Sequence, residues 1–509
     1  MARDTSRDDA AAVFSPEPTS SAGLDPALQE RVVLASATVF VAVLHAVGFA
    51  GVRMDDAYIT YRYGENVARA RGFVFNPGER LLGTSAPGHA LIAAAFHAVV
   101  GHDRLPGAMS VLGAVAWTAQ AALLYGLLRP RVGRRPAVVV ALGIAAGAAQ
   151  SYLFVPLETN VVAALVLGSV LLAVRGRWNL AGLALGVATV VRADALLAAG
   201  PLALLAVRDL RGGAWRPLAA FAAPVAAWTV PATAYFGAPW PHTLAVKLYA
   251  SSVATYARHV VTSPWGDLFA ATGKLPLGYG LVAWGLAAWG WAIAASANRR
   301  VLVLPAWAGL HVLAYLVLRP GVAFLWHLYP VALVLVSGLL CLLGWGLNRL
   351  PSAGAVAATV LTTGVFGWRT LVFSVDYDDL LWFGVRDRVD REVASYLRSA
   401  ATPGDLVDSE EVGTLAYFSD LSMLDHAGLV TRADRAGLDP YDRVRAHCRA
   451  LATIPRLRFL VMNEFEVAFH RCLYGQRPLV RFEARARYGT WKVWVADRAG
   501  PAISDAPAP

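Results

Sequence analysis

Two adjacent carboxylates open a polar stretch directly after the first long apolar segment. The stretch runs from Asp55 and Asp56 to Tyr63, and the apolar segment before it covers 32–51. A charge placed against lipid headgroups is unfavourable unless it has a use. A carboxylate within hydrogen-bonding reach of an alcohol can take its proton as the alcohol attacks. Asp55 and Asp56 are therefore the candidates for a catalytic base, with a slight preference for Asp55, and capping a helix is the alternative use of either carboxylate.

Other polar side chains near the ends of apolar segments are candidates for contacting a substrate. A departing phosphate needs cationic or hydrogen-bonding groups close to it. The candidates are Arg62, Glu158, Arg192, Asp194, His242, Lys247, Arg319 and His327. Most have a plainer use as well: Arg192 and Asp194 can simply pair, and Lys247 can extend its ammonium group to the membrane interface. His89 and His97 are expected to be structural.

The elements that must hold these side chains are membrane-spanning helices. The chain has 509 residues, of which 57% are hydrophobic and 16% charged, and its mean hydropathy is +0.49. A soluble protein carries about 25% charged residues. Apolar runs of about 20 residues recur, and each is long enough to cross a bilayer. The composition therefore predicts a polytopic α-helical membrane protein.

The positive charge is distributed unevenly along the chain. Before Asp376 there are 27 basic and 15 acidic residues, a net charge of +12, and from Asp376 onward there are 18 basic and 20 acidic residues, a net charge of −2. A nucleic-acid-binding domain gathers its basic residues on one soluble face, so no nucleic-acid partner is expected. The basic excess belongs to the membrane part, where it indicates topology.

About eleven spans are predicted, at 31–51, 105–128, 137–155, 160–174, 179–192, 195–207, 217–236, 273–297, 301–318, 323–346 and 352–372. If each span reverses direction, the Arg-rich connections at 129–135, 175–177, 208–216 and 299–300 all share the side of the N-terminus. The positive-inside rule makes that side cytoplasmic. The chain is thus predicted to be a multi-pass plasma-membrane protein whose C-terminal domain is extracytoplasmic. The alternation requires two short helices that meet near Arg192.

Two regions are predicted up to residue 373. Residues 1–28 are polar and aperiodic, which predicts a disordered cytoplasmic tail. Residues 29–373 form the transmembrane domain. Its first outer loop, 52–104, is predicted to hold two short helices at the membrane surface, near 57–71 and 85–99.

The region 374–500 alternates helix and strand signals and is predicted to be an extracytoplasmic α/β domain docked over the outer face, followed by a disordered tail at 501–509. Helices are expected at 386–399, near 415–417 and at 439–450, and strands at 406–408, 457–463 and 491–496. Cys448 and Cys472 form one disulfide if the domain is outside, or remain free thiols, and the sequence leaves both open. No Cys/His spacing typical of a metal site appears.

Several segments resemble, in chain order, one family of membrane enzymes. Residues 55–63 and 75–80 look like the first outer loop of glycosyltransferases of the GT-C fold, and most of all like the actinobacterial terminal β-(1→2) arabinofuranosyltransferases of cell-wall assembly. Shorter similar pieces are Leu157-Glu158-Thr159, Arg192-Ala193-Asp194, Pro241-His242-Thr243 with Lys247, and the stretches 413–418 and 424–429. The sequence departs from the family's pattern at Ala193, His242 and 84–89.

The resemblance implies a GT-C fold and a reaction in which a sugar moves, with inversion, from a polyprenyl-phosphate donor to a hydroxyl of a polysaccharide or glycolipid acceptor at the outer face. It favours arabinofuranose as the sugar; a mannosyl- or other glycosyltransferase of the same architecture is the alternative. GT-C members differ in metal use, and Asp55, Asp56 and Glu158 could converge on a divalent ion, but no metal or other cofactor is predicted. A transporter is disfavoured because no repeat appears and the acidic residues gather at one surface. A non-catalytic assembly protein is disfavoured because both aspartates are intact.

Overall fold

The structure is a computed structural model, and it describes residues 53–145, 156–247, 257–258, 260–262, 277–297, 299–318, 325–350, 354, 357, 359–365, 368, 383–425, 428–431, 454, 456–464, 479–486 and 489–499. The two terminal tails, the first span, Arg319, the predicted helix at 439–450 and the pair Cys448 and Cys472 lie outside these residues, so the predictions made for them stay predictions.

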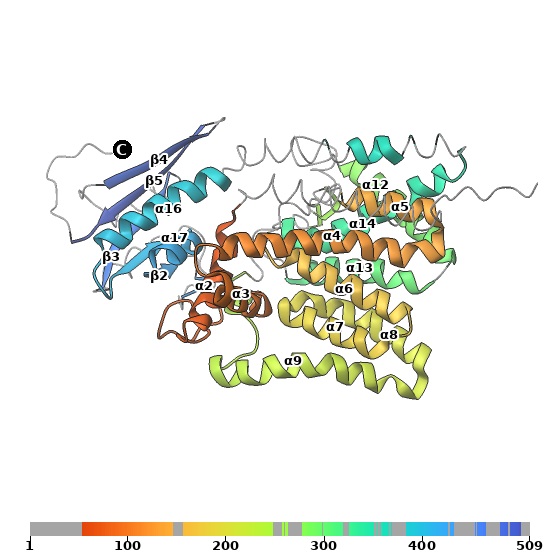
Figure 1. Ribbon diagram of the computed structural model, residues 1–509, viewed down its shortest axis with the longest axis horizontal. Coiled ribbons are helices and arrows are strands. Elements are labelled where there is room, and N and C mark those ends of the chain that lie inside the picture. Colours follow the sequence, from red (N-terminus) through yellow and green to blue (C-terminus); the bar gives the residue numbers. More distant parts are fainter. Residues whose placement is uncertain are drawn as a thin grey trace, which may run out of the picture.

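The described parts follow one another along the long axis of the molecule (Figure 1). A small sheet with one helix occupies one end, and a bundle of apolar helices occupies the other. Three short helices, α2 (Asp55–Ala68), α3 (Pro87–Val100) and α17 (Val412–Ser419), lie between them. The first outer loop and the C-terminal region therefore meet in the middle of the molecule.

The bundle contains, within the described residues, α4 (Leu105–Val132), α5 (Arg134–Ala145), α6 (Thr159–Val174), α7 (Trp178–Val191), α8 (Ala199–Leu210), α9 (Trp215–Phe236), α10 (His242–Lys247), α12 (Leu277–Ala297), α13 (Val303–Leu318) and α14 (Leu325–Leu347). Five helices of the described chain are long and apolar enough to cross a membrane, namely Leu105–Pro130, Trp215–Phe236, Leu277–Ser296, Arg299–Leu318 and Trp326–Leu347. Such helices suit a bilayer because each satisfies its own backbone polar groups. The number eleven and the direction of each span stay predictions.

Small residues allow α7 and α9 to pack closely. A Cβ atom on Gly182 would meet the carbonyl oxygen of Pro217, and one on Gly186 would meet that of Phe221. The two glycines are four residues apart and share one face of α7. Small residues at this spacing are typical of close helix pairs in membranes, where apolar burial alone does not drive association.

The chain breaks after α7, where two short helices were predicted to meet. Arg192 is extended, with φ −155° and ψ 128°, and a 3₁₀ helix (η2, Ala193–Ala198) leads into α8. The break gives Arg192 and Asp194 a place outside regular α-helix. Both side chains thereby face the cavity, where Arg192 meets Glu158 just before α6.

The two helices of the outer loop are present; α2 is buried within the protein, whereas α3 exposes Leu91 and Val99. Their predicted place at the membrane surface stays a prediction. Residues Ala57 to Asn66 of α2 are all buried, because α3 packs on one side of the helix and α17 on another. The N-cap of α2 is Met54, and no side chain caps the helix. The interpretation of Asp55 or Asp56 as the cap of this helix is therefore wrong. Within α2 and its C-cap, Arg69 Nη2 lies 2.8 Å from Glu65 Oε1.

The C-terminal region contains a five-stranded mixed sheet in the order β2-β1-β3-β5-β4. The strands are β1 (Leu406–Ser409), β2 (Ser422–Asp425), β3 (Leu457–Asn463), β4 (Leu479–Ala486) and β5 (Gly489–Asp497). β1 pairs in parallel with β2 and β3, and β5 pairs antiparallel with β3 and β4. The sequence patterns located β1, β3 and β5 but missed β2 and β4.

One helix covers a face of this sheet and continues its core toward the outer loop. Helix α16 (Phe383–Ala400) buries Val389, Val393 and Leu397 in a cluster with Phe459 and Val495 of the sheet. The same cluster includes Ile59 and Tyr63 of α2, Phe75 and Ala90. Because one apolar core runs through both parts, the outer loop and the C-terminal region form one packed unit.

Candidate functional site

A cavity of about 320 Å³ opens between the outer loop and the helix bundle. Its wall combines segments that are far apart in sequence: the start of α2, the loop 83–85, the residues just before α6, the residues just after α7, the start of α10, and α13 with α14. The cavity brings together five of the residues predicted from the sequence, namely Asp56, Glu158, Arg192, Asp194 and His327. Leu429 of the C-terminal region completes the wall.

Helix α2 presents one face to this cavity. Asp56, Ile59 and Thr60 line it, and residues three and four apart lie on the same side of an α-helix. The hydroxyl oxygens of Thr60 and Thr84 are 3.0 Å apart, and the amide of Ala86 donates to Thr84 Oγ1 at 3.1 Å. These bonds hold the loop after residue 82 against α2, so the carboxylate of Asp56 and the loop form one continuous wall.

A buried arginine gathers two carboxylates at another part of the cavity wall. Arg192 Nη2 is 2.8 Å from Asp194 Oδ2, and its Nη1 is 3.4 Å from Glu158 Oε1 and 3.3 Å from Thr159 Oγ1. A buried charge is costly unless it is paired and hydrogen-bonded. The break after α7 and the start of α6 thus meet through one guanidinium, which fixes both carboxylates at the cavity.

Aromatic and imidazole rings form a third part of the wall. Tyr315 stacks on His311 with ring centroids 4.7 Å apart, and it lies 5.3 Å from the His327 ring. The ring nitrogen His311 Nε2 donates to the backbone oxygen of His327 at 2.6 Å, which joins α13 to α14. Tyr315 and His327 both line the cavity, and the Tyr315 hydroxyl hydrogen-bonds with Arg192. Tyr315 was not predicted from the sequence, because one tyrosine in an apolar helix gives no signal of its own.

Asp55 is held on a different side of α2, where its carboxylate meets the first turn of α17. The amide of Gly413 donates to Asp55 Oδ2 at 2.9 Å, and the amide of Thr414 donates to Oδ1 at 2.6 Å. An anion at a helix N-terminus is stabilised by the free amides and by the helix dipole. Burial raises the pKa of Asp55, and the two backbone donors oppose that rise. A Cβ atom on Gly413 would meet the backbone oxygen of Asp55, so glycine permits this close approach.

Arg62 also serves the contact with the C-terminal region. Its side chain is fully buried, pairs with Asp420 just after α17, and lies 3.7 Å from Glu65. Asp420 also accepts from Arg69 at 3.3 Å and from Arg71 at 2.8 Å. Burial alone would raise the pKa of Asp420, but the hydrogen bond from Arg71 and the charge of Arg62 hold it well below its ordinary value.

The motif at 75–80 makes a further contact of the same kind. The side chain of Asn76 donates to the backbone oxygen of Met423 at 2.8 Å and accepts from the Met423 amide at 2.9 Å. It pairs with the edge strand β2 as another strand would. This motif therefore joins the outer loop to the sheet rather than lining the cavity.

The remaining sequence candidates have other positions. The backbone amide of His242 donates to the carbonyl of Leu82 at 2.7 Å, which anchors α10 to the outer loop. The cavity wall includes Pro241 and Thr243 on either side of His242 but not His242 itself. Lys247 is the last residue of α10. Within the described chain, Asp55, Asp56 and Glu158 do not form a group with metal-ligand spacing, because Asp55 is turned toward α17.

Comparison with solved structures identifies the fold. The chain is similar to ArnT from Cupriavidus metallidurans bound to undecaprenyl phosphate, with a TM-score of 0.58, 15% identity, and coverage of 93% of this chain and 100% of that chain. The apo state of the same protein has a TM-score of 0.58 and 14% identity, with coverage of 94% of this chain and 100% of that chain. The oligosaccharyltransferase of Archaeoglobus fulgidus in the apo form has a TM-score of 0.52 and 12% identity, with coverage of 92% of this chain and 75% of that chain. No protein-family model and no curated protein matches the sequence. The chain therefore has the GT-C fold, and its membrane-protein neighbours agree with its apolar helices.

Proposed function

We propose that the protein is a membrane glycosyltransferase that moves a sugar, with inversion, from a polyprenyl-phosphate donor to a glycan hydroxyl. The observation that carries the proposal is the cavity in which Asp56 faces the same space as Arg192, Glu158 and Asp194. The GT-C fold supports sugar transfer. A structural neighbour, ArnT, is bound to undecaprenyl phosphate, and this supports a polyprenyl phosphate as the carrier.

Asp56 is the catalytic base in this proposal. Its carboxylate takes the proton from the acceptor hydroxyl as that oxygen bonds to the anomeric carbon, while the bond from this carbon to the phosphate oxygen breaks on the opposite face. Asp55 has the same chemistry available, but both of its carboxylate oxygens accept amide hydrogen bonds from α17. It is also absent from the cavity wall. The geometry therefore favours Asp56, whereas the sequence slightly favoured Asp55.

Cations must stabilise the phosphate as it leaves. Among the described cavity residues, the charge of Arg192 is shared between Glu158 and Asp194. We therefore assign Lys247 and Arg319 to the phosphate as well, together with His327. Lys247 follows the cavity residue Thr243 by about one turn of α10. Glu158 and Asp194 are then the acceptors for sugar hydroxyls, and they keep Arg192 oriented.

The favoured sugar is arabinofuranose, and the favoured acceptor is a cell-wall polysaccharide. This choice rests on the resemblance of 55–63 and 75–80 to the terminal arabinofuranosyltransferases. The basic loops support a plasma-membrane enzyme with a cytoplasmic N-terminus and an extracytoplasmic C-terminal domain. The alternative is a mannosyl- or other glycosyltransferase with a different acceptor, since Ala193 and 84–89 depart from the pattern beside the cavity.

Donor consumption by the purified full-length protein in lipid nanodiscs tests the proposal. Polyprenyl-phosphate arabinofuranose, mannose and glucose are offered separately, with an oligosaccharide acceptor, and release of polyprenyl phosphate is measured. We expect one donor to be consumed by the wild type and none by Asp56→Asn. The enzyme assignment fails if the wild type consumes no donor, and the assignment of Asp56 fails if the variant works at the wild-type rate.

A further inference from the structure

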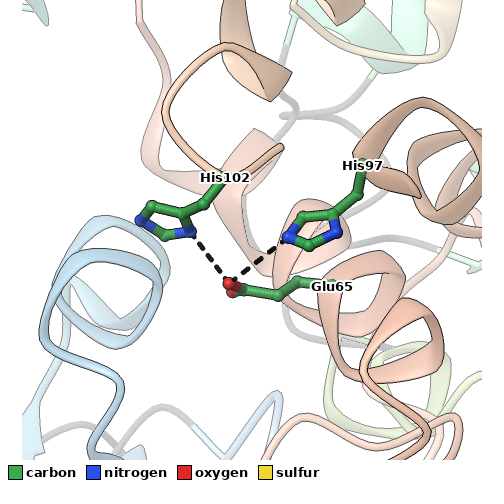
Figure 2. A group of neighbouring side chains, drawn as sticks. All are labelled: Glu65, His97 and His102. Atoms are coloured by element: carbon green, nitrogen blue, oxygen red, sulfur yellow. Dashed lines mark hydrogen bonds and ion pairs between the residues drawn. The ribbon is translucent and has the colours of Figure 1, made fainter. Parts of the chain in front are cut away.

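Away from the cavity, three metal-ligating side chains converge behind α2. Glu65 belongs to α2, His97 to the last turn of α3, and His102 to the loop that joins α3 to α4. Figure 2 shows the two imidazole rings on either side of the Glu65 carboxylate, with a ring nitrogen of each turned toward it. Glu65 Oε1 is 2.8 Å from His102 Nδ1 and 3.7 Å from His97 Nε2. We propose that these three side chains bind a divalent transition-metal ion of the zinc class.

The ligand atoms are close to the spacing that a tetrahedral zinc ion requires. Bonds of about 2.0–2.2 Å to nitrogen and oxygen place two ligand atoms of a tetrahedron roughly 3.3 Å apart. The two distances to Glu65 Oε1 lie on either side of this value, and the three ligand atoms all fall within 4.8 Å of one another. Small side-chain rotations therefore suffice to bind an ion.

The ligand types also select the ion. Two imidazoles and one carboxylate suit zinc and its neighbours, whereas magnesium and calcium prefer oxygen ligands. His97 Nε2 and Glu65 Oε2 are buried without a hydrogen-bond partner in the described structure, so both have capacity to spare. Three protein ligands leave the fourth tetrahedral position for water. The partly exposed rings of His97 and His102 give an ion access from solvent.

Two arginines lie beside Glu65 and must be accommodated. Arg69 Nη2 is 2.8 Å from the same oxygen, Oε1, that would bind the ion, and Arg62 lies 3.7 Å from Oε2. Arg69 has a second carboxylate available, because its Nη1 is 3.3 Å from Asp420. A bound ion would move Arg69 onto Asp420, while Arg62 keeps its contact with the second oxygen of Glu65. The Glu65 carboxylate can thus exchange the Arg69 guanidinium for the metal ion.

The consequence of binding concerns the contact between the outer loop and the C-terminal region. His102 stacks on Tyr417 of α17, with ring centroids 4.3 Å apart and planes inclined by 12°. The Tyr417 hydroxyl donates to the backbone oxygen of His102 at 2.6 Å. An ion that fixes His102 to α2 and α3 therefore also fixes the platform on which α17 rests. Glu65, His97 and His102 are absent from the cavity wall, so the site stabilises the assembly and is separate from the proposed catalytic groups.

Zinc content and thermal stability test the site without any assay of sugar transfer. The full-length protein, purified without a histidine tag, is stripped with a chelator, equilibrated with buffered zinc and analysed for bound metal. We expect about one ion per chain, and a rise in unfolding temperature with zinc concentration, because a ligand that binds only the folded state stabilises it. His97→Gln and Glu65→Gln should lose both effects.

Glu79→Gln is the matched control, because it removes a carboxylate of the same outer loop that lies outside the cluster. It should bind zinc as the wild type does. His97→Gln is the most informative variant, since its Nε2 makes no hydrogen bond in the described structure and the chain should fold without it. The proposal is overturned if the wild type binds no zinc, or if His97→Gln binds zinc and gains stability as fully as the wild type.

Discussion

The two sides of helix α2 carry neighbouring aspartates into different surroundings. Asp56 faces the cavity together with Thr60, whereas Asp55 binds the amides of α17 and Arg62 binds Asp420. An α-helix turns by about 100° per residue, so two successive carboxylates of a helix leave it in different directions. One helix therefore lines the cavity on one side and holds the C-terminal region on the other.

A change in the contact with the C-terminal region should affect the cavity more than a change in the cavity affects that contact. Leu429 of the C-terminal region lines the cavity, and its amide donates to Asp425 Oδ2 at 2.5 Å. Loosening the contact with α17 should therefore disturb the cavity. A change of charge inside the cavity should leave that contact intact, because no described cavity carboxylate bonds to α17. The predictions below test this asymmetry.

The largest effect is expected from Asp56→Asn. Loss of a positioned base lowers transfer by about 100- to 10,000-fold, and the amide keeps the size of the side chain. The unfolding temperature should stay at the wild-type value, since Asp56 makes no described contact with the C-terminal region. Sugar transfer and thermal unfolding are measured on the same preparation.

Asp55→Asn is its control on the other side of the helix. It removes one of two accepting oxygens at α17, and loss of a helix cap costs about 0.5–2 kcal/mol. Transfer at a temperature where the variant is folded should fall less than tenfold. If Asp55→Asn abolishes transfer without loss of stability while Asp56→Asn works normally, the two roles are reversed.

A smaller loss of activity is expected from Arg192→Lys. An ammonium group cannot bridge Glu158, Asp194 and a phosphate as a planar guanidinium does. Removal of one donor to a developing charge typically costs about 100-fold in rate. Kinetics against donor concentration measure the effect.

Arg192→Ala distinguishes geometry from charge: it leaves Glu158 and Asp194 unpaired, and a broken buried ion pair costs about 3–5 kcal/mol of stability. An unchanged unfolding temperature in Arg192→Ala would contradict the pairing.

On the other side of α2, Gly413→Ala should lower stability. The new Cβ would meet the Asp55 backbone oxygen, and overpacking of this kind costs about 1–3 kcal/mol. Gly107→Ala is the matched control, because a Cβ there has no neighbour within 4 Å. Thermal unfolding compares the two. Equal unfolding temperatures for both variants would show that α17 does not rest closely on Asp55.

The sequence predicts more of the cavity side of α2 than of the side that contacts the C-terminal region. The cavity residues follow from the ends of apolar segments, because a charge at a membrane boundary stands out against a uniform apolar background. Glu158, Arg192 and Asp194 were found in this way, and the structure brings them together. The membrane helices are predictable for the same reason. The short strands β2 and β4 were missed, because their pairing depends on distant partners rather than on a local period.

The role of the other side was hidden for a physical reason. Arg62 and Glu65 belong to the segment 57–71 that was predicted to be a helix at the membrane surface, yet both side chains are fully buried. Arg62 pairs with Asp420, which lies more than 300 residues away in the chain, and no local pattern encodes such a contact. The motif at 75–80 carried part of the resemblance to a glycosyltransferase loop, and its Asn76 pairs with β2. A polar helix face alone does not show whether its side chains are exposed to solvent or buried in a network of ion pairs.

The smallest expected effect concerns the ion cluster around Asp420. The folded pKa of Asp420 lies below its ordinary value of 3.8, so its ionised form contributes stability fully above pH 3.8. That contribution is lost as the pH falls from 3.8 through the lower folded value. Asp420→Asn removes it, and asparagine tolerates the left-handed backbone at this position, where φ is 60°.

The wild type should therefore be more stable than Asp420→Asn by about 1 kcal/mol at neutral pH, since partly exposed ion pairs contribute little. The difference should shrink as the pH falls below 3.8. Thermal unfolding across this pH range measures it, with Glu483→Gln as a control, because that exposed carboxylate of β4 pairs with the exposed Arg481. A difference that grows toward acid pH would mean that Asp420 is neutral in the folded protein, and the arginines of α2 would then hold the C-terminal region by some other contact.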